Sequence, residues 1–200
     1  MNPILSTALA EHRAQLMVCE ACPNLGPCVP PIGPSDPLLF IIGQSPGREE
    51  VDAGMPFVGR AGGLLNELLV AAGIPRDRCF ITNTVKCWPT NNRPSEADEI
   101  ANCRKYLVAE LKLLQPKALL CLGRDALRVF GALIPFHHGL RIMEGATKVL
   151  VSYHPAYYLR QSGMLHQFLG LADSLSEMVY GTVRPTSDRR EPEEERPEGS

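Results

Sequence analysis

Short apolar runs alternate with amphipathic stretches along the 200-residue chain. Four of these runs are rich in Ile, Leu, Val or Phe, and they lie at 38–42, 79–85, 118–122 and 148–153. Runs of this length that are bounded by Gly, Pro, Asn or His are typical of buried strands. We therefore predict four strands in the interior of the protein.

Apolar residues with helical spacing occupy the stretches between and around these runs. The predicted helices span 4–18, 64–72, 95–114, 124–130 and 164–180. Strands that alternate with helices predict an α/β domain with a parallel sheet. The chain is long enough for one such domain, which we place at 1–183. The Pro-, Glu- and Arg-rich tail at 184–200 is predicted to be disordered.

Candidate chemistry follows three of the four predicted strands. The first strand leads into a Gly/Pro-rich loop at 43–60, the second ends at Asn83, and the fourth is followed by His154. Ligands bind at the carboxyl ends of strands in open α/β sheets, so these three features are expected to meet in one site. Phe57 is a large aromatic residue in an otherwise polar loop, and Glu50 is one of its carboxylates.

Four of the seven cysteines have the spacing of a metal site. Cys19 and Cys22 form a C-x-x-C pair, whereas Cys87 and Cys103 follow the second predicted strand and enter a predicted helix. Four thiolates suit either a [4Fe–4S] cluster or a zinc ion, and the spacing does not choose between them.

The other three cysteines differ in their surroundings. Cys79 and Cys121 lie in apolar runs, where a free cysteine behaves as a small hydrophobic residue. Cys28 lies in a Pro/Gly-rich connector and fits two interpretations, a replacement ligand or a free thiol.

Charge gives little support for a nucleic-acid partner. The formal net charge is −2, and residues 1–183 hold equal numbers of basic and acidic side chains. A nucleic-acid binder usually carries a basic excess, so only a local patch would serve that role. The chain has neither an apolar run of about 18 residues nor a secretory signal pattern, and we expect a cytoplasmic protein without a membrane span.

Taken together, the motifs resemble those of the family-4 uracil-DNA glycosylases. The resemblance rests on GQSPGREE…GMPFVGRAG, ITNTVKCWPTNNRP, YHPAYYLR and the early C-x-x-C, and it covers roughly residues 15–180. It implies a three-layer α/β/α fold with a central four-stranded parallel sheet. It further implies a [4Fe–4S] cluster on Cys19, Cys22, Cys87 and Cys103, remote from the chemistry.

The family's activity would make this chain a monofunctional glycosylase that removes uracil from DNA as a monomer and precedes later base-excision repair enzymes. Phe57 would stack on the flipped base, Asn83 would recognise its edge, and His154 would donate a hydrogen bond to O2. Further candidates are Glu50 as the acceptor that orients the attacking water and Asn92 as a residue that contacts DNA or steadies the site. The loop around the base would supply Gly43, Gln44, Ser45 and Gly47, and Arg60, Arg93 and Arg160 would contact phosphates.

One position departs from the family's pattern. Gln44 and Ser45 stand where the family usually has Glu followed by Ala or Gly, so a neutral amide replaces a carboxylate. This departure motivates a second hypothesis, a relative that has an altered base range or binds uracil-DNA without turnover. The seven cysteines motivate a third, an iron–sulfur redox or sensor protein. The histidine-bearing basic insert of covalent-binding relatives is absent, so irreversible trapping of uracil is not expected.

Overall fold

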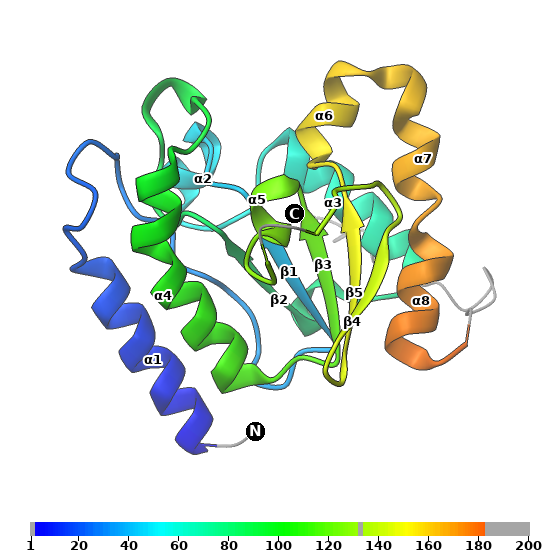
Figure 1. Cartoon of the computed structure of the whole chain (residues 1–200), viewed down its shortest axis with the longest axis horizontal. Coiled ribbons are helices and arrows are strands. Elements are labelled where there is room, and N and C mark those ends of the chain that lie inside the picture. Colours follow the sequence, from blue (N-terminus) through cyan, green and yellow to red (C-terminus); the bar gives the residue numbers. More distant parts are fainter. Residues whose placement is uncertain (1–2, 132–133, 183–200) are drawn as a thin grey trace, which may run out of the picture.

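A five-stranded sheet forms the centre of the protein (Figure 1). The computed structural model describes residues 3–131 and 134–182. The strand order is β2-β1-β3-β5-β4. The strands are β1 (Leu39–Gly43), β2 (Cys79–Asn83), β3 (Ala118–Leu122), β4 (Arg141–Glu144) and β5 (Thr147–Ser152). The first three and β5 run parallel, as predicted.

The fifth strand corrects the expectation of a four-stranded, wholly parallel sheet. β4 pairs antiparallel with β5 at the edge of the sheet, and Glu144 lies opposite Thr147 across a tight turn. Gly145 adopts a left-handed φ of 59° in that turn. Most side chains of β4 are exposed, so its sequence lacks the apolar run that identified the other strands.

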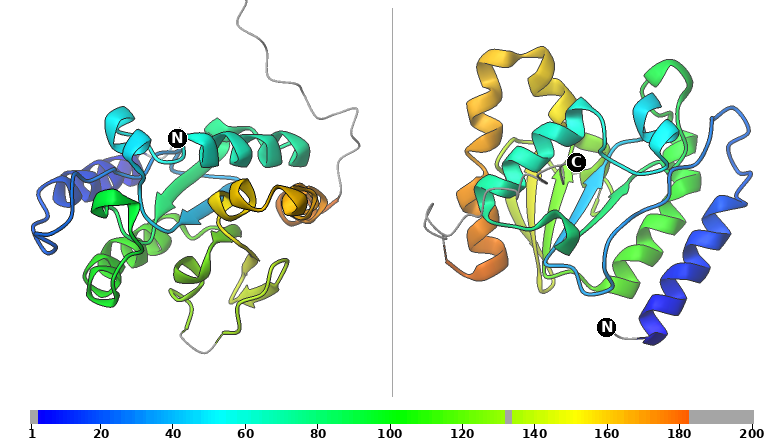
Figure 2. Two further views of the ribbon diagram at one scale, coloured as in Figure 1. Left: turned by 90° about the horizontal axis from the view of Figure 1, so that it is seen from above. Right: turned by 180° about the vertical axis from the view of Figure 1, so that it is seen from behind.

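Helices cover both faces of the sheet and complete the predicted three layers (Figure 2). One face packs against α3 (Arg60–Ala72), α6 (Pro155–Arg160), α7 (Leu165–Leu169) and α8 (Ala172–Tyr180). The other face packs against α4 (Ala97–Leu114) and α5 (Arg124–Leu127), with α1 (Pro3–Met17) alongside α4. A short helix, α2 (Arg48–Ala53), lies within the loop after β1.

Three helix predictions need adjustment. The helix predicted for 164–180 is divided into α7 and α8 around Gly170. The helix predicted for 124–130 ends at Leu127, and α2 and α6 were not predicted at all because both are six-residue segments. No described helix has both the length and the apolar character needed to cross a membrane. The predicted disordered tail at 184–200 lies outside the described residues.

Alternation along the central strands divides the core between the two faces. In β1, Leu39 and Ile41 belong to the cluster beneath α3, whereas Phe40 and Ile42 belong to the cluster beneath α4. All five residues of β1 are buried because strands pair on both of its sides. This burial fixes the register that places Gly43, the last residue of β1, directly beside Asn83.

Candidate active site and cysteine cluster

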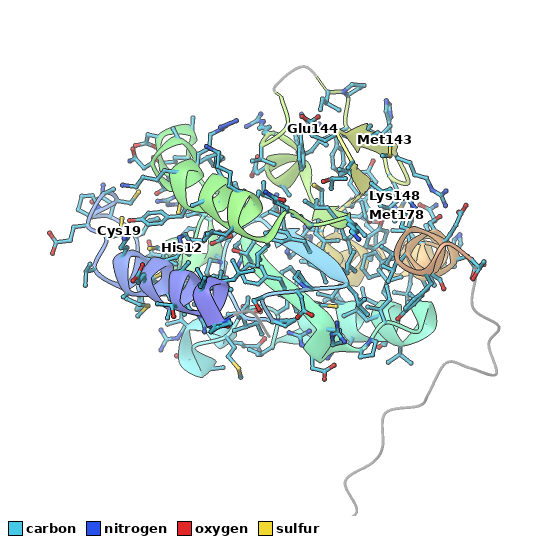
Figure 3. The ribbon with its side chains drawn as sticks, turned by 90° about the horizontal axis from the view of Figure 1, so that it is seen from below. His12, Cys19, Met143, Glu144, Lys148 and Met178 are labelled. Atoms are coloured by element: carbon cyan, nitrogen blue, oxygen red, sulfur yellow. The ribbon has the colours of Figure 1, made fainter. Side chains whose placement is uncertain are left out.

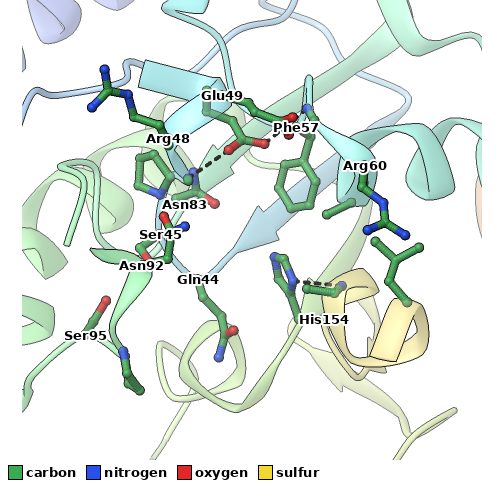
Figure 4. A pocket seen from close by; sticks show the side chains of 18 of the residues that line it. Gln44, Ser45, Arg48, Glu49, Phe57, Arg60, Asn83, Asn92, Ser95 and His154 are labelled. Atoms are coloured by element: carbon green, nitrogen blue, oxygen red, sulfur yellow. Dashed lines mark hydrogen bonds between the residues drawn. The ribbon is translucent and has the colours of Figure 1, made fainter. Parts of the chain in front are cut away.

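A cavity of about 640 Å³ opens at the carboxyl ends of the parallel strands (Figure 4). Its walls come from the loop after β1, the end of β2, the segment before α4 and the start of α6. The predicted site residues that line it are Gln44, Ser45, Gly47, Glu50, Phe57, Arg60, Asn83, Asn92, Arg93, His154 and Arg160. The structure thus brings together, in one cavity, residues separated by more than a hundred positions in the sequence.

Gly43 lies beneath the cavity and explains why two larger side chains approach each other. A Cβ atom at this position would lie 2.2 Å from Asn83 Oδ1 and 2.7 Å from the ring of Phe57. Real Cβ atoms essentially never come that close to another atom, so any other residue at 43 would displace Asn83 or Phe57. The glycine therefore makes room for both groups.

Phe57 is buried and held in an unusual backbone conformation. Its φ is 56°, in the left-handed region that bulky residues rarely adopt. Arg76 donates hydrogen bonds of 3.0 Å to the carbonyl oxygens of Pro56 and Phe57. Gly62 also leaves room for this turn, since a Cβ there would lie 1.8 Å from the Phe57 carbonyl oxygen. Backbone strain of this kind is concentrated at functional sites.

Asn83 presents an unsatisfied polar atom inside the protein. Its side chain is 3% exposed, and its Oδ1 has no hydrogen-bond partner. A buried acceptor without a partner costs about 1–3 kcal/mol. An N–H group of a ligand in the cavity would remove that cost, so Asn83 is suited to recognise such a group.

His154 is the N-cap residue immediately before α6, and its surroundings make it a neutral hydrogen-bond donor. Its Nδ1 accepts a hydrogen bond of 3.3 Å from the backbone N–H of Ala156. Burial, together with the nearby positive charge of Arg160, lowers the pKa of His154 to about 4. The ring is therefore neutral at pH 7, and its proton resides on Nε2 because Nδ1 acts as an acceptor.

Phe57, Asn83 and His154 form a continuous surface in the cavity. The rings of Phe57 and His154 lie 5.5 Å apart between centroids at 31°, and Asn83 approaches Phe57 across Gly43. Figure 4 shows these side chains around the same space. An apolar face, an amide edge and an N–H donor thus line a space suited to one small planar ligand.

Comparison with known proteins identifies the family. A model of the Uracil DNA glycosylase superfamily matches residues 30–173. The chain belongs to this superfamily. A type-4 uracil-DNA glycosylase of Thermotoga maritima is 40% identical over 150 residues, covering 71% of this chain and 78% of that protein. The type-4 enzyme of Archaeoglobus fulgidus is 31% identical over 186 residues, covering 86% and 93%.

The chain is also similar to a relative of another type. A type-5 uracil-DNA glycosylase of Pyrobaculum aerophilum is 32% identical over 181 residues, covering 71% of this chain and 80% of that protein. The family assignment confirms the predicted family, and the fold agrees with it apart from the added strand β4.

Glu50 stabilises the loop of this superfamily member. Its two carboxylate oxygens accept hydrogen bonds from the backbone N–H groups of Gly47 at 2.8 Å and Gly59 at 3.4 Å. A Cβ at Gly47 would lie 2.6 Å from the Glu50 carboxylate, so the glycine permits this contact. Glu50 therefore joins the start and the end of the loop that carries Phe57.

Gln44 extends along the floor of the glycosylase cavity. Its side chain packs against Gly123, where a Cβ would lie 2.9 Å from Gln44 Cγ and Cδ. The backbone of Gln44 is also held in place, because Val85 N–H donates a hydrogen bond of 2.9 Å to its carbonyl oxygen. This pairing fixes Gln44 in the cavity beside Ser45.

Asn92 is held by a residue that sequence reasoning missed. Its Oδ1 accepts a hydrogen bond of 2.8 Å from the indole N–H of Trp88. The guanidinium of Arg48 lies 5.5 Å above the Trp88 ring and also lines the cavity. The sequence signal for both was weak, because a single Trp or Arg in a polar loop is usually a surface residue.

The three predicted phosphate-binding arginines have different surroundings. Arg60 at the start of α3 and Arg160 at the end of α6 are exposed at the rim of the cavity. Arg93 forms an ion pair with Glu99, and the two closest atoms are 2.5 Å apart. Arg93 must therefore share its guanidinium between Glu99 and any phosphate.

A second centre gathers cysteine side chains from the end of α1, the connector, the exit of β2 and α4. Cys19 and Cys28 pack against the cluster of Leu16, Cys103 and Tyr106. Figure 3 shows Cys19 just beyond the end of α1. All described cysteines are free thiols, and Cys79 and Cys121 are buried in β2 and β3, as predicted.

The four predicted ligands are all thiols, the donor set of a [4Fe–4S] cluster or of a zinc ion. Among the described residues, no group of three His, Cys, Asp or Glu side chains is close enough to hold one metal ion. Backbone N–H of Lys86 donates to Cys103 Sγ at 3.3 Å, and the amide of Asn102 donates to Cys22 Sγ at 3.6 Å. Such N–H donors tune iron–sulfur thiolates.

A buried charged network connects this cysteine region to the glycosylase pocket. Lys86 is fully buried, and its ammonium donates to Glu110 at 2.9 Å and to the backbone carbonyl oxygen of Asn83 at 2.6 Å. His12, which faces α4 from α1 (Figure 3), contacts the other oxygen of Glu110 at 3.0 Å. The sequence gives no sign of this network, because a lysine at a strand end is usually exposed.

Proposed function

We propose that this chain is a monofunctional DNA glycosylase that hydrolyses the N-glycosidic bond of uracil flipped out of DNA and leaves an abasic site. One observation supports the proposal most directly, the buried unpaired Oδ1 of Asn83 beside the rings of Phe57 and His154. We further propose that it acts as a cytoplasmic monomer and that later base-excision repair enzymes process the abasic site.

Recognition of uracil follows from the hydrogen-bonding groups of Asn83. Its Oδ1 would accept from N3–H of the base, and its amide N–H would donate to O4. Cytosine presents the opposite pattern at both positions, so a fixed amide rejects it. Phe57 would stack on the base and offset part of the few kcal/mol that extrusion from the duplex costs.

Bond cleavage requires stabilisation of the leaving base. Water attacks C1′ of the sugar, the electron pair of the C1′–N1 bond passes to the base, and negative charge develops on O2. Neutral His154 would donate its Nε2–H to that oxygen, and one such donor typically contributes about 10²–10³ in rate. The pKa of about 4 keeps this role available across neutral pH.

The attacking water would be held by Glu50 and Asn92. A carboxylate offers about four lone-pair positions, and two backbone N–H groups occupy one on each oxygen of Glu50. The remaining positions can orient a water molecule. Asn92 is fixed through its Oδ1 by Trp88, which leaves its amide N–H free to donate to water or to the sugar.

The backbone around the base would come from Gly43, Gln44, Ser45 and Gly47. Phosphates flanking the flipped nucleotide would contact Arg60, Arg93 and Arg160, which supply a local basic patch on an otherwise neutral body.

A [4Fe–4S] cluster on Cys19, Cys22, Cys87 and Cys103 completes the proposal. The cluster would fix the end of α1, the exit of β2 and α4 relative to one another, and its contribution when bound is structural. Iron and acid-labile sulfide in a brown protein would support this cofactor, whereas a colourless protein with one zinc would reject it.

The decisive experiment compares two asparagine variants on a uracil-containing oligonucleotide. Asn83→Ala is expected to lose uracil excision while its circular dichroism spectrum stays unchanged. Asn24→Ala, an exposed residue outside the cavity, serves as the matched control and is expected to retain full activity. A wild-type protein that forms no abasic site in uracil-DNA, as tested by alkaline cleavage at every enzyme concentration, would reject the proposal.

Gln44 supports a second candidate function, an altered base range or binding without turnover. The neutral amide places no charge on the cavity floor, and the similarity to a type-5 relative shows that the chain also resembles a second group within the superfamily. Oligonucleotides carrying uracil, hypoxanthine, xanthine or a thymine mismatch distinguish these alternatives. A gel shift without alkaline cleavage would indicate binding alone.

A further inference from the structure

Two loop segments near the cysteines pair through an isolated antiparallel β-bridge. Residues 26–29 of the connector run alongside residues 86–88 after β2. Val29 N–H donates to the Lys86 carbonyl oxygen at 2.8 Å, and Trp88 N–H donates to the Pro27 carbonyl oxygen at 3.0 Å. These two hydrogen bonds flank one central pair of residues.

That central pair is Cys28 and Cys87. The hydrogen bonds join the neighbours of the two cysteines and not the cysteines themselves, which defines a non-hydrogen-bonded pair. In such a pair the Cα atoms lie about 4.5 Å apart and the side chains are closer than in the alternate pair. A disulfide needs Cα atoms roughly 4.4–6.8 Å apart, so this position suits one.

The side chains already face each other. Side chains of a directly opposed cross-strand pair project to the same face, and both cysteines are partly buried and free. Cys28 lies outside the four proposed cluster ligands, whereas Cys87 belongs to them. The pair therefore joins a spare thiol to a ligand.

We propose that Cys28 and Cys87 form a disulfide when the cluster is absent and a peroxide is present. One thiolate attacks the peroxide, the O–O bond breaks, and a sulfenic acid forms as water leaves. The second thiolate then attacks that sulfur, a second water leaves, and the S–S bond forms. Two thiols lose two hydrogens in total, and the peroxide takes up both electrons.

The disulfide would control loading of the cluster. Once its sulfur is bonded to Cys28, Cys87 cannot serve as a thiolate ligand, and the set of four is incomplete. A thiol reductant reverses the bond through exchange and restores the ligand. The disulfide rests on the backbone pairing alone, whereas its effect on loading also rests on the proposed ligand set.

The first experiment maps disulfides in the full-length protein after removal of iron. Hydrogen peroxide is added, remaining thiols are alkylated, and non-reduced peptides are fragmented in a mass spectrometer. The expected product is a cross-link between Cys28 and Cys87 that is absent from Cys28→Ser. Cys79→Ala, which removes a buried thiol of β2, is the matched control and is expected to form the same cross-link. Oxidation confined to Cys19 and Cys22 would overturn the inference.

The second experiment adds iron and sulfide to the oxidised protein and follows cluster absorbance and bound iron. Wild type is expected to load only after a thiol reductant, whereas Cys28→Ser loads after the same peroxide treatment without a reductant. A cross-linked protein that loads normally would show that Cys87 is not a ligand and would count against the proposed ligand set. Normal loading of peroxide-treated protein that has no cross-link would overturn the disulfide instead.

Discussion

The protonation state of His154 gives the sharpest test of the site. Because Nδ1 accepts from Ala156 N–H, the neutral ring can offer only Nε2–H to a base in the cavity. Removal of this donor in His154→Ala should lower the single-turnover rate of uracil excision by about 10²–10³, which corresponds to about 3–4 kcal/mol of transition-state stabilisation. His154→Gln retains an N–H donor and should lose less.

The pH dependence of stability and of excision distinguishes a neutral His154 donor from a charged one. The ordinary pKa of histidine is 6.5, whereas burial and Arg160 lower the pKa of His154 to about 4. The folded protein therefore binds fewer protons than the unfolded chain between pH 6.5 and 4, and its stability rises with pH in that window. The difference between the two pKa values corresponds to at most about 3 kcal/mol of folding stability. This stability is lost as the pH falls from 6.5 to 4. Above pH 6.5 both states are neutral and the contribution is constant.

Excision rates at limiting substrate should consequently show no titration of His154 between about pH 5.5 and 7.5, the range about one unit on either side of an ordinary histidine pKa. His154→Ala and His154→Gln should have the same profile shape as wild type. His166→Ala, which removes an exposed histidine outside the cavity, is the matched control with full activity. A wild-type limb near pH 6.5 that disappears in His154→Gln would refute the neutral-donor argument.

Three other predictions test different parts of the structure. Gly43→Ala should abolish excision because its Cβ would displace the amide and the aromatic ring of the pocket, whereas Gly63→Ala, which has nothing within 4 Å, should leave activity unchanged. Lys86→Met should lower the free energy of unfolding in urea by about 3–5 kcal/mol, because it leaves the buried Glu110 carboxylate without its ammonium, and a second Glu110→Met change should recover most of that loss. Arg160→Ala should weaken DNA binding and reduce the salt slope by about one phosphate contact, as measured by fluorescence anisotropy over a series of salt concentrations.

The sheet and the main helices were predictable because their residues are buried. β1, β3 and the apolar part of β5 are wholly buried, so each appears as a continuous apolar run in the sequence. β4 was not predictable, since an exposed edge strand needs no apolar side chains and forms through its turn with β5. Helix α2 was not predictable either, because few of its side chains are buried. It is fixed by the Glu50 carboxylate at its start and by Gly54, in a left-handed conformation, at its end.

The convergence of Phe57, Asn83 and His154 was predictable from the strand ends and the family resemblance, but their states were not. Parallel strands place their carboxyl ends together, and this rule brought the three segments to one site. The neutral ring of His154 depends on one backbone N–H two residues later, and the unpaired Oδ1 of Asn83 depends on the space above Gly43. Both are properties of three-dimensional distances that no spacing along the chain encodes.

The segment after β2 links the two centres of the molecule through covalent structure. Asn83 enters the pocket and Cys87 enters the cysteine region, and only three residues separate them. Lys86 lies between them and bonds both to the backbone of Asn83 and to Glu110 of α4, the helix that also carries Cys103. Any shift of the cysteine region must therefore move the anchor of Asn83. If the proposed iron–sulfur cluster binds these cysteines, this geometry would connect it to the accuracy of base recognition without a part in the chemistry.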